Sequence, residues 1–231
     1  MTRQLYELVG TDAARPFSPY CWRTRMALAH KGLEITSVPW RFTEREAIAP
    51  HGSEKVPVLV DGDRTVSDSW AIATYLEDAY PDRPSLFGGE GGRAMGRMLN
   101  WWGDTVVIAG MFPMIVADIW THLLPADQAY FRQSREARFG KTLEEVSADR
   151  EQRVAGFRKS LDPMRLTLKT QPFLGGEAPN YADYMMFGGF QWARATSAFQ
   201  LLAPEDAIYA WREKLLDAFG GLARRSPGYD I

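Results

Sequence analysis

The chain has 231 residues, of which 45% are hydrophobic and 24% are charged, as is typical of folded globular proteins. Its 27 Lys and Arg against 29 Asp and Glu give a formal net charge of −2, which argues against binding to nucleic acid or to an anionic membrane surface. The single cysteine, Cys21, excludes an internal disulfide, and no uninterrupted apolar run of about 18 residues is present to span a membrane, so we expect a cytoplasmic protein.

The first forty residues alternate between strand and helix patterns. Residues 5–9 and 35–38 have the pattern of short β-strands. Between them, Ser18 suits the N-cap of a helix and Pro19 its first position, and apolar residues recur at helical spacing up to Gly32. This order predicts a strand, a helix and a second strand.

A hairpin and a second helix complete the first part of the chain. The pair Asp61-Gly62 lies between two strand-like runs and predicts a tight turn. A helix is expected to start at Asp68-Ser69 and to end before Pro81. We therefore predict an α/β domain over residues 1–84.

The rest of the chain has the pattern of helices. The Gly-rich segment 85–92 predicts a flexible linker, and residues 93–231 an all-helical domain. Residues 95–122 have the pattern of one long helical segment, in which Pro113 is expected to cause a kink or break near Gly110.

Later segments are also helical. Residues 149–170 have the pattern of a charged helix with an apolar stripe and a bend at Pro163, and a last helix is expected over 204–219. The segment Asn180-Tyr181-Ala182-Asp183 resembles a capping box, with Asp183 in the place of the usual Glu or Gln. The charged residues of 132–153 are expected to form a solvated helix face.

Several common chemistries lack their motifs in this chain. We find no nucleophile elbow, phosphate-binding loop, zinc-protease motif or dinucleotide-binding motif. The histidines His30, His51 and His122 are scattered, so we expect no metal site. The eight tryptophans indicate either a large aromatic core or an apolar pocket lined by flat rings, suited to an aromatic ligand.

Three short segments could together hold a ligand. The segment Ser18-Pro19-Tyr20-Cys21 opens a helix, where free N–H groups and the helix dipole would stabilise a thiolate. A cis bond at Val56-Pro57 would present the Val56 backbone to an extended peptide. The helix start at Asp68-Ser69 would favour a carboxylate, and Asp68 could meet an ammonium group.

Each segment also has a purely structural explanation: an N-cap, a trans proline at a strand edge, and ordinary helix capping. One ligand would satisfy all three segments, namely a short peptide with a thiol, an α-carboxylate and an amino group. Glutathione is such a ligand.

In their order along the chain, these segments resemble the cytosolic glutathione transferases, and the Gly-rich linker and the capping box extend the resemblance to the whole chain. More narrowly, Ser18–Thr24, Asp68–Trp70, Tyr80–Pro84 and Ser134–Glu136 resemble the bacterial β-aryl etherases of lignin breakdown and a related fungal class. The resemblance implies a thioredoxin-like domain that binds glutathione, a helical domain that carries the second substrate, and a homodimer.

The resemblance also implies roles for single residues. The Ser18 hydroxyl would face the glutathione sulfur, and the Val56 backbone would pair with the cysteinyl unit. Lys55, or else Arg41, would meet the glycyl carboxylate. The implied glutathione contacts are Ser18, Tyr20, Lys55, Val56, Pro57, Asp68 and Ser69. Our candidates for the aromatic pocket, chosen for their flat or flexible apolar side chains, are Trp101, Trp102, Met111, Phe112 and Trp120.

The expected function is a glutathione transferase that attacks an aromatic electrophile, with cleavage of a β-aryl ether as its narrower form. One alternative is a non-catalytic carrier of aromatic compounds, because the same rings would serve it equally well. Another is a glutathione-dependent thiol reductase that acts through Cys21. Because Ser18 stands where related reductases carry a cysteine, no dithiol route is available, and we expect Cys21 to be a buried, inert thiol.

Overall fold

A four-stranded sheet forms the first part of the protein, for which a computed structural model describes residues 3–231. The central strand β1 (Arg3–Leu8) pairs in parallel with β2 (Ile35–Trp40) and antiparallel with β3 (Val58–Asp61). Strand β4 (Arg64–Ser67) pairs antiparallel with β3, so that the strand order is β2-β1-β3-β4.

The hairpin between β3 and β4 differs by one residue from the prediction. Asp61 pairs with Arg64, so the two turn residues are Gly62 and Asp63. Gly62 has a φ of 60°, a conformation that glycine adopts without steric cost. The turn chemistry was therefore predicted correctly, and its register was wrong by one position.

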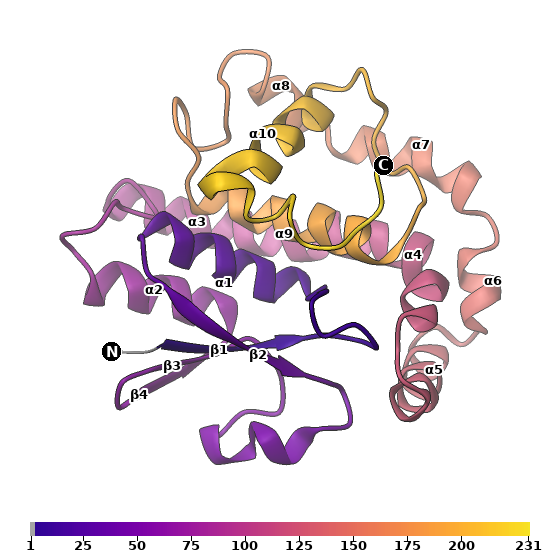
Figure 1. Cartoon of the computed structure of the whole chain (residues 1–231). Helices are drawn as coiled ribbons and strands as arrows, with labels where there is room; N and C mark the ends of the chain where they lie inside the picture. Colours follow the sequence, from indigo (N-terminus) through magenta and orange to yellow (C-terminus); the bar gives the residue numbers. More distant parts are fainter. Residues whose placement is uncertain (1–2) are drawn as a thin grey trace.

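Two helices cover one face of the sheet, and a short connection lies on the other (Figure 1). Helix α1 (Pro19–His30) follows β1, and α2 (Ser69–Ala79) follows the hairpin. Between β2 and β3 the chain forms the short 3-10 helices η1 (Arg45–Ala47) and η2 (Ala49–His51). This topology confirms the predicted thioredoxin-like α/β domain.

The predicted flexible linker, segment 85–92, overlaps the start of a helix. Helix α3 (Glu90–Trp102) begins inside segment 85–92, and Leu86 and Phe87 are buried. A Cβ at Gly92 would lie 1.8 Å from the Phe87 carbonyl oxygen, so the first turn of α3 packs too closely against this segment for any larger residue. Gly92 therefore permits close packing here, whereas a Cβ at Gly88, Gly89 or Gly91 would meet nothing within 4 Å, and the bounds of the two domains remain a prediction.

The predicted break in the long helical segment lies upstream of its expected position. Between α3 and α4 (Ala109–Thr121), residues Gly103–Ile108 form a π-helical turn, η3. Pro113 lies within α4 and has no N–H to donate to the carbonyl group four residues earlier. Helix α4 continues through Gly110 and Pro113, so there is no break at the expected position.

Within residues 3–231, the helical run Glu90–Thr121 is long and apolar enough to pass as a membrane span, contrary to the expectation from sequence. Its most apolar 18-residue window has a mean hydropathy of 1.4, and half of that window is buried inside the protein. Met111, Met114 and Ile115 on α4 are all buried. Such burial is typical of a core helix.

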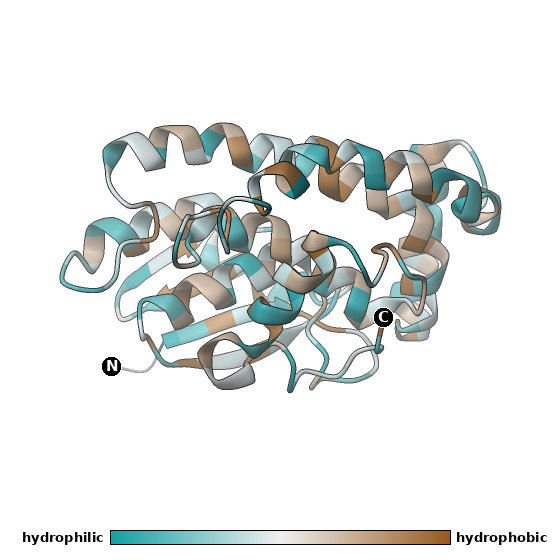
Figure 2. Cartoon of the chain, turned by 90° about the horizontal axis from the view of Figure 1, so that it is seen from above, coloured by the Kyte–Doolittle hydropathy of each residue, from teal (hydrophilic) through white to brown (hydrophobic). Residues whose placement is uncertain are grey.

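The remaining helices are α5 (Pro125–Phe139), α6 (Leu143–Ser147), α7 (Arg150–Ser160), α8 (Asp162–Thr167), α9 (Tyr181–Thr196) and α10 (Ala207–Gly221). Of these, α9 packs over α1 and α3, whereas α5 and α6 lie to one side, against α4 (Figure 1). The predicted bend at Pro163 is a full break, since α7 ends at Ser160 and Pro163 lies in the first turn of α8. Figure 2 shows hydrophobic and hydrophilic residues interspersed along these helices, as expected where one side of each faces a core.

The capping box predicted at Asn180 is confirmed. The Asn180 side chain accepts a hydrogen bond from the Ala182 N–H, and the Asp183 side chain accepts one from the Asn180 N–H. All sixteen residues of α9 except Ala182 are buried, which makes α9 the central helix of the helical domain.

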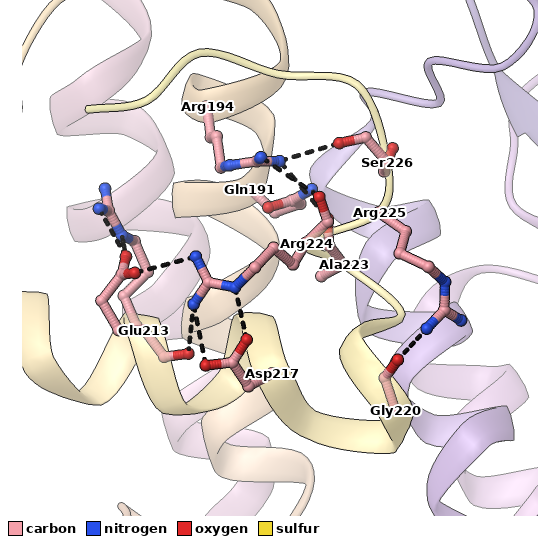
Figure 3. Close-up of polar contacts among 10 residues, drawn as sticks. Gln191, Arg194, Glu213, Asp217, Gly220, Ala223, Arg224, Arg225 and Ser226 are labelled. Carbon is pink, nitrogen blue, oxygen red and sulfur yellow. Dashed lines mark hydrogen bonds and ion pairs between the residues drawn. The ribbon is translucent and has the colours of Figure 1, made fainter.

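The C-terminal segment folds back over α9 and α10 (Figure 3). Arg194 on α9 donates a hydrogen bond to the Ser226 carbonyl oxygen at 3.0 Å. Arg224 lies between Asp217 and Glu213 of α10, 3.1 Å from the Glu213 carboxylate. These contacts fix the end of the chain against the buried helix.

Candidate functional site

A cavity of about 480 Å³ lies between the sheet domain and the helical domain. Its walls come from the start of α1, the loop after β2, the segment before β3, η3 and α4, and one face each of α5 and α9. The lining residues are Leu8, Phe17, Ser18, Pro19, Tyr20, Trp40, Phe42, Arg45, Glu54, Lys55, Val56, Ile108, Phe112, Ile119, Tyr130, Phe131, Ser134, Arg135, Arg138 and Trp192. Four of the seven residues predicted to bind glutathione are among them.

Ser18 lies at the wall of this cavity as the N-cap of α1. Its hydroxyl oxygen accepts a hydrogen bond from the Cys21 N–H at 3.4 Å, and 4% of the residue is exposed. Among the described residues, none accepts a hydrogen bond from the Ser18 hydroxyl. The hydroxyl proton is therefore available to a ligand, at a helix end that favours negative charge.

The start of α1 is held in place by α9. A Cβ at Gly188 would lie 2.3 Å from the Pro19 carbonyl oxygen, so α9 approaches α1 as closely as glycine permits. One turn later, the buried Arg23 donates to the Met185 carbonyl oxygen at 3.0 Å and pairs with Asp104 at 2.7 Å. The position of Ser18 therefore depends on a helix far away in sequence.

The segment before β3 supplies the second group of predicted residues. The Val56–Pro57 peptide bond is cis. Lys55 and Val56 line the cavity, and the Val56 backbone makes none of the hydrogen bonds found within residues 3–231. An extended peptide in the cavity could therefore pair with both backbone groups of Val56.

The third group, Asp68 and Ser69, lies at the start of α2 and does not line the cavity. One Asp68 carboxylate oxygen caps the helix by accepting from the N–H groups of Trp70 and Ala71, each at 3.0 Å. Asp68 is exposed and has a φ of 77°, a strained conformation for a residue other than glycine. Tyr181 of α9 donates a hydrogen bond to the Ser69 carbonyl oxygen at 2.8 Å, which braces this strained turn.

Of the five residues predicted for the aromatic pocket, only Phe112 lines the cavity. Trp101 is 54% exposed on α3, and Met111 is fully buried in the core. Trp102 and Trp120 are half-buried outside the lining, with the Trp120 ring stacked against Arg132 at 4.8 Å. These four side chains lie outside the cavity lining in this structure, and their part in binding a second substrate stays a prediction.

Most of the aromatic wall consists of residues that were not predicted from the sequence. Phe112 packs against Trp192 of α9 with ring centroids 5.3 Å apart. Phe42, in the loop after β2, packs against Tyr130 and Phe131 of α5 at 5.9 and 5.8 Å. The adjacent pair Tyr130-Phe131 on an otherwise charged helix was the one signal in the sequence that α5 has an inward face.

Arginines on the same face of α5 were also missed. Arg135 and Arg138 line the cavity, although the charged residues of this stretch were expected to form a solvated face. The Arg135 guanidinium lies over the rings of Phe131 and Phe42, at 4.5 and 5.3 Å. Burial lowers the pKa of Arg135, because this cation is partly removed from water.

Burial changes the pKa of two further groups near Ser18. Burial raises the pKa of the Tyr20 hydroxyl at the cavity wall, which keeps it protonated and able to donate a hydrogen bond. Cys21 is completely buried, and its burial raises the pKa of the thiol to about 12. This agrees with the expected inert thiol and leaves Cys21 unsuited to the reductase alternative, because only the thiolate reacts.

A second cavity, of about 580 Å³, lies among α4, α7 and the C-terminal segment, and none of the predicted residues lines it. Its charged groups are largely paired: Arg150 contacts Asp118 at 2.7 Å, and Arg158 donates to the Leu201 carbonyl oxygen at 2.9 Å. Within residues 3–231, we find no cluster of His, Cys, Asp or Glu side chains that could hold a metal ion.

Comparison with known families gives a match to both halves of the chain. The family model of the glutathione S-transferase N-terminal domain matches residues 14–84, and that of the C-terminal domain matches residues 94–211. Among curated proteins, Glutathione S-transferase Z2 of Arabidopsis thaliana is 36% identical over 98 residues, which cover 39% of this chain and 41% of the relative. A zeta-class glutathione S-transferase of Euphorbia esula is 41% identical over 70 residues, 28% of this chain and 31% of the relative. The chain thus spans less than half the length of these relatives.

Solved structures match over nearly the whole chain. The glutathione transferase GSTFuA3 from Phanerochaete chrysosporium is 26% identical, with a TM-score of 0.77 and coverage of 100% of this chain and 99% of that protein. The glutathione S-transferase CsGST63524 of Ceriporiopsis subvermispora, solved in complex with glutathione, is 22% identical with the same TM-score, covering 97% and 94% of the two chains. The second likeness shows a shared fold.

Proposed function

The chain belongs to the glutathione S-transferase family, and we propose that it catalyses the attack of the glutathione thiolate on an aromatic electrophile. The observation that carries this proposal is that Ser18 and a group of aromatic rings line one cavity. A hydroxyl with a free proton at a helix N-terminus suits a thiolate, and the rings suit a flat second substrate.

In this proposal, glutathione lies across the starts of α1, β3 and α2. Its contacts are Ser18, Tyr20, Lys55, Val56, Pro57, Asp68 and Ser69. The Ser18 hydroxyl donates to the sulfur, the Val56 backbone pairs with the cysteinyl unit, and Lys55 meets the glycyl carboxylate. The second oxygen of Asp68, which takes no part in capping, meets the ammonium group of the γ-glutamyl unit.

Arg41, the other candidate for the glycyl carboxylate, is engaged elsewhere. Its guanidinium donates to the Gly10 carbonyl oxygen at 3.1 Å and pairs with Glu44 at 3.0 Å. Lys55 lines the cavity and has no carboxylate partner among the described residues. These contacts favour Lys55 for that role.

The protein activates the thiol by stabilising its anion. A free cysteine-type thiol has a pKa of about 8.5, so about a tenth or less is ionised at neutral pH. A hydrogen bond to the charged sulfur contributes about 1.5–3 kcal/mol, and the helix end about 0.3–1 kcal/mol. Together they lower the thiol pKa by about 1.5–3 units, so that the thiolate becomes the main form.

The narrower form of the proposal is the cleavage of a β-aryl ether. The sulfur attacks the carbon that bears the aryloxy group, next to a ketone, so that a C–S bond forms as the C–O bond breaks. The bonding pair leaves on the aryloxy oxygen, which then takes a proton from water to give a phenol. The resemblance of Ser18–Thr24 to the etherases supports this form.

Phenol release tests this form directly. With glutathione and a β-aryloxy ketone, we expect the protein to release phenol and glutathionyl ketone in equal amounts, well above the uncatalysed rate. Conjugation of another aromatic electrophile without phenol release would refute ether cleavage alone. Binding of aromatic compounds without any conjugation would instead support the non-catalytic carrier.

We further propose that the protein is a cytoplasmic homodimer that associates through α3. Met95 and Met98 are each 58% exposed and Trp101 is 54% exposed, and they form an apolar face on this helix. Contiguous exposed apolar residues of this kind mark interaction surfaces.

Replacing Met98 by Glu should convert the dimer to a monomer, because a desolvated charge in an apolar interface costs several kcal/mol. Sedimentation velocity measures the change. Leu166→Glu is a matched control, since Leu166 is 62% exposed on α8, away from this face. A monomeric wild-type protein, or a Met98→Glu variant that stays dimeric, would contradict the proposal.

A further inference from the structure

The cavity holds more positive charge than glutathione needs. Among the described residues that line it, Arg45, Lys55, Arg135 and Arg138 are cationic, and Glu54 is the one carboxylate. The glutathione contacts proposed above lie on the sheet domain and use one of these cations, Lys55. Arg135 and Arg138 enter from α5 in the helical domain, on the side of the second substrate.

Neither Arg135 nor Arg138 has a carboxylate partner within residues 3–231. The Arg135 guanidinium donates to the Ser134 hydroxyl at 2.7 Å and otherwise stacks on aromatic rings. Arg138 lies 5.8 Å from the centre of the Phe112 ring. Arg132, one turn earlier on the same helix, is by contrast paired with Glu136 at 2.8 Å and Glu144 at 2.7 Å. Arg132 is thus paired with carboxylates, whereas Arg135 and Arg138, which line the cavity, are not.

We propose that Arg135 and Arg138 select an aromatic electrophile that carries an acidic group, such as a carboxylate, and this inference rests on the proposed transferase function. The aromatic part of the substrate lies against Phe112 and Trp192, and its carboxylate reaches the guanidinium groups. An aromatic acid can contact both the rings and the arginines of the cavity wall. A guanidinium forms paired hydrogen bonds with a carboxylate and lies flat on aromatic rings.

We expect Arg135 to contribute more than Arg138 to the binding of the acidic group. Arg135 is half-buried between Phe131 and Phe42, so its interaction with an anion is weakly screened by water. Arg138 is exposed and contributes less for the same reason. Arg135 is therefore the main specificity residue.

A matched pair of substrates tests this inference without relying on ether cleavage. The acid is 4-chloro-3,5-dinitrobenzoate and the neutral partner is its methyl ester, both of which lose chloride to glutathione. Each kcat/KM is divided by the uncatalysed rate constant, since the two rings differ in intrinsic reactivity. We expect the wild-type protein to prefer the acid by about tenfold, as one charge-assisted hydrogen bond would give.

Variants test whether Arg135 causes the preference for the acid over the ester. Arg135→Met should bring the acid-to-ester ratio close to one by lowering the value for the acid, Arg135→Lys should retain part of the preference, and Arg132→Met should leave it unchanged. An equal loss of kcat/KM for the acid and the ester in Arg135→Met would overturn the inference. If the KM for glutathione also rises, Arg135 binds glutathione; if it does not, Arg135 acts on the leaving group. Equal turnover of acid and ester by the wild type would also overturn it, whereas no turnover of either would refute the transferase function itself.

Discussion

Replacing Ser18 by Ala should lower kcat by about 10- to 100-fold at neutral pH. The proposed hydrogen bond to the thiolate contributes about 1.5–3 kcal/mol, and each 1.4 kcal/mol corresponds to about a factor of ten. The pH dependence of kcat should shift upward by about 1–2 units, because the variant must form the thiolate without this hydrogen bond. Steady-state kinetics between pH 6 and 9 with a neutral aromatic electrophile measure both effects.

Cys21→Ala is the matched control for this experiment. Cys21 lies one turn further along α1 and is completely buried, so its removal should leave kcat and its pH dependence unchanged. The loss of the N-cap in Ser18→Ala should cost only about 1 kcal/mol of stability, so the variant should remain folded. Full activity of Ser18→Ala, or loss of activity in Cys21→Ala, would contradict the role given to the hydroxyl.

Replacing Asp183 by Ala should destabilise the protein by about 3–5 kcal/mol, the largest effect on stability that we expect. One carboxylate oxygen of Asp183 accepts from the Leu174 N–H and the Trp211 indole N–H, each at 2.7 Å. The other accepts from the N–H groups of Gly175 and Asn180, at 2.9 and 3.0 Å. Truncation leaves these donors without a partner in a buried site, which costs about 1–3 kcal/mol for each donor that water does not reach.

Urea unfolding measures this loss. Because the loss is comparable to the whole stability of many domains, Asp183→Asn is a second variant that keeps one accepting oxygen and should lose about half as much. Asp149→Ala is the control, since Asp149 precedes α7 without capping it and forms only an exposed ion pair with Arg153. A loss below about 1 kcal/mol in Asp183→Ala would show that the capping box is dispensable.

Asp183 lies on the helix that also holds the proposed glutathione-binding residues in place. Its helix α9 supplies Tyr181, which holds the Ser69 carbonyl oxygen, and Gly188, which packs on Pro19 beside Ser18. Both helix starts that are proposed to bind glutathione are therefore braced by the helix that Asp183 caps. A destabilised Asp183 variant should accordingly also bind glutathione more weakly.

The features that could be predicted from sequence are those that local chemistry decides. An N-cap at Ser18, a capping box at Asn180 and a turn near Gly62 each depend on residues within a few positions of one another. The order of these local elements was enough to predict the α/β sheet domain and the helical domain.

The aromatic wall could not be predicted in full because its rings come from the loop after β2, α4, α5 and α9, which only the tertiary fold brings together. The π-helical turn Gly103–Ile108 inserts an extra residue into the helical run, which rotates everything after it by about 100°. A single helical period over residues 95–122 therefore does not carry over from α3 to α4. Phe112 faces the cavity while its neighbour Met111 faces the core.

The inward face of α5 was hidden for a different reason. Charged residues favour a solvated face, and Arg132 does lie on one, paired with Glu136 and Glu144. Arg135 lies over Phe42, from a loop about ninety residues earlier, as well as over Phe131 of its own helix. Tertiary contact, and not periodicity, decides which arginine faces the cavity.

The most direct test of the central claim is a titration of glutathione bound to the wild-type protein, in which the ultraviolet absorbance of the thiolate is followed against pH. If the Ser18 hydroxyl and the start of α1 stabilise the anion, the bound thiol should titrate about 1.5–3 units below its free pKa of about 8.5 and be mostly ionised at pH 7. A bound thiol that titrates at its free value, or no binding of glutathione at all, would contradict the account.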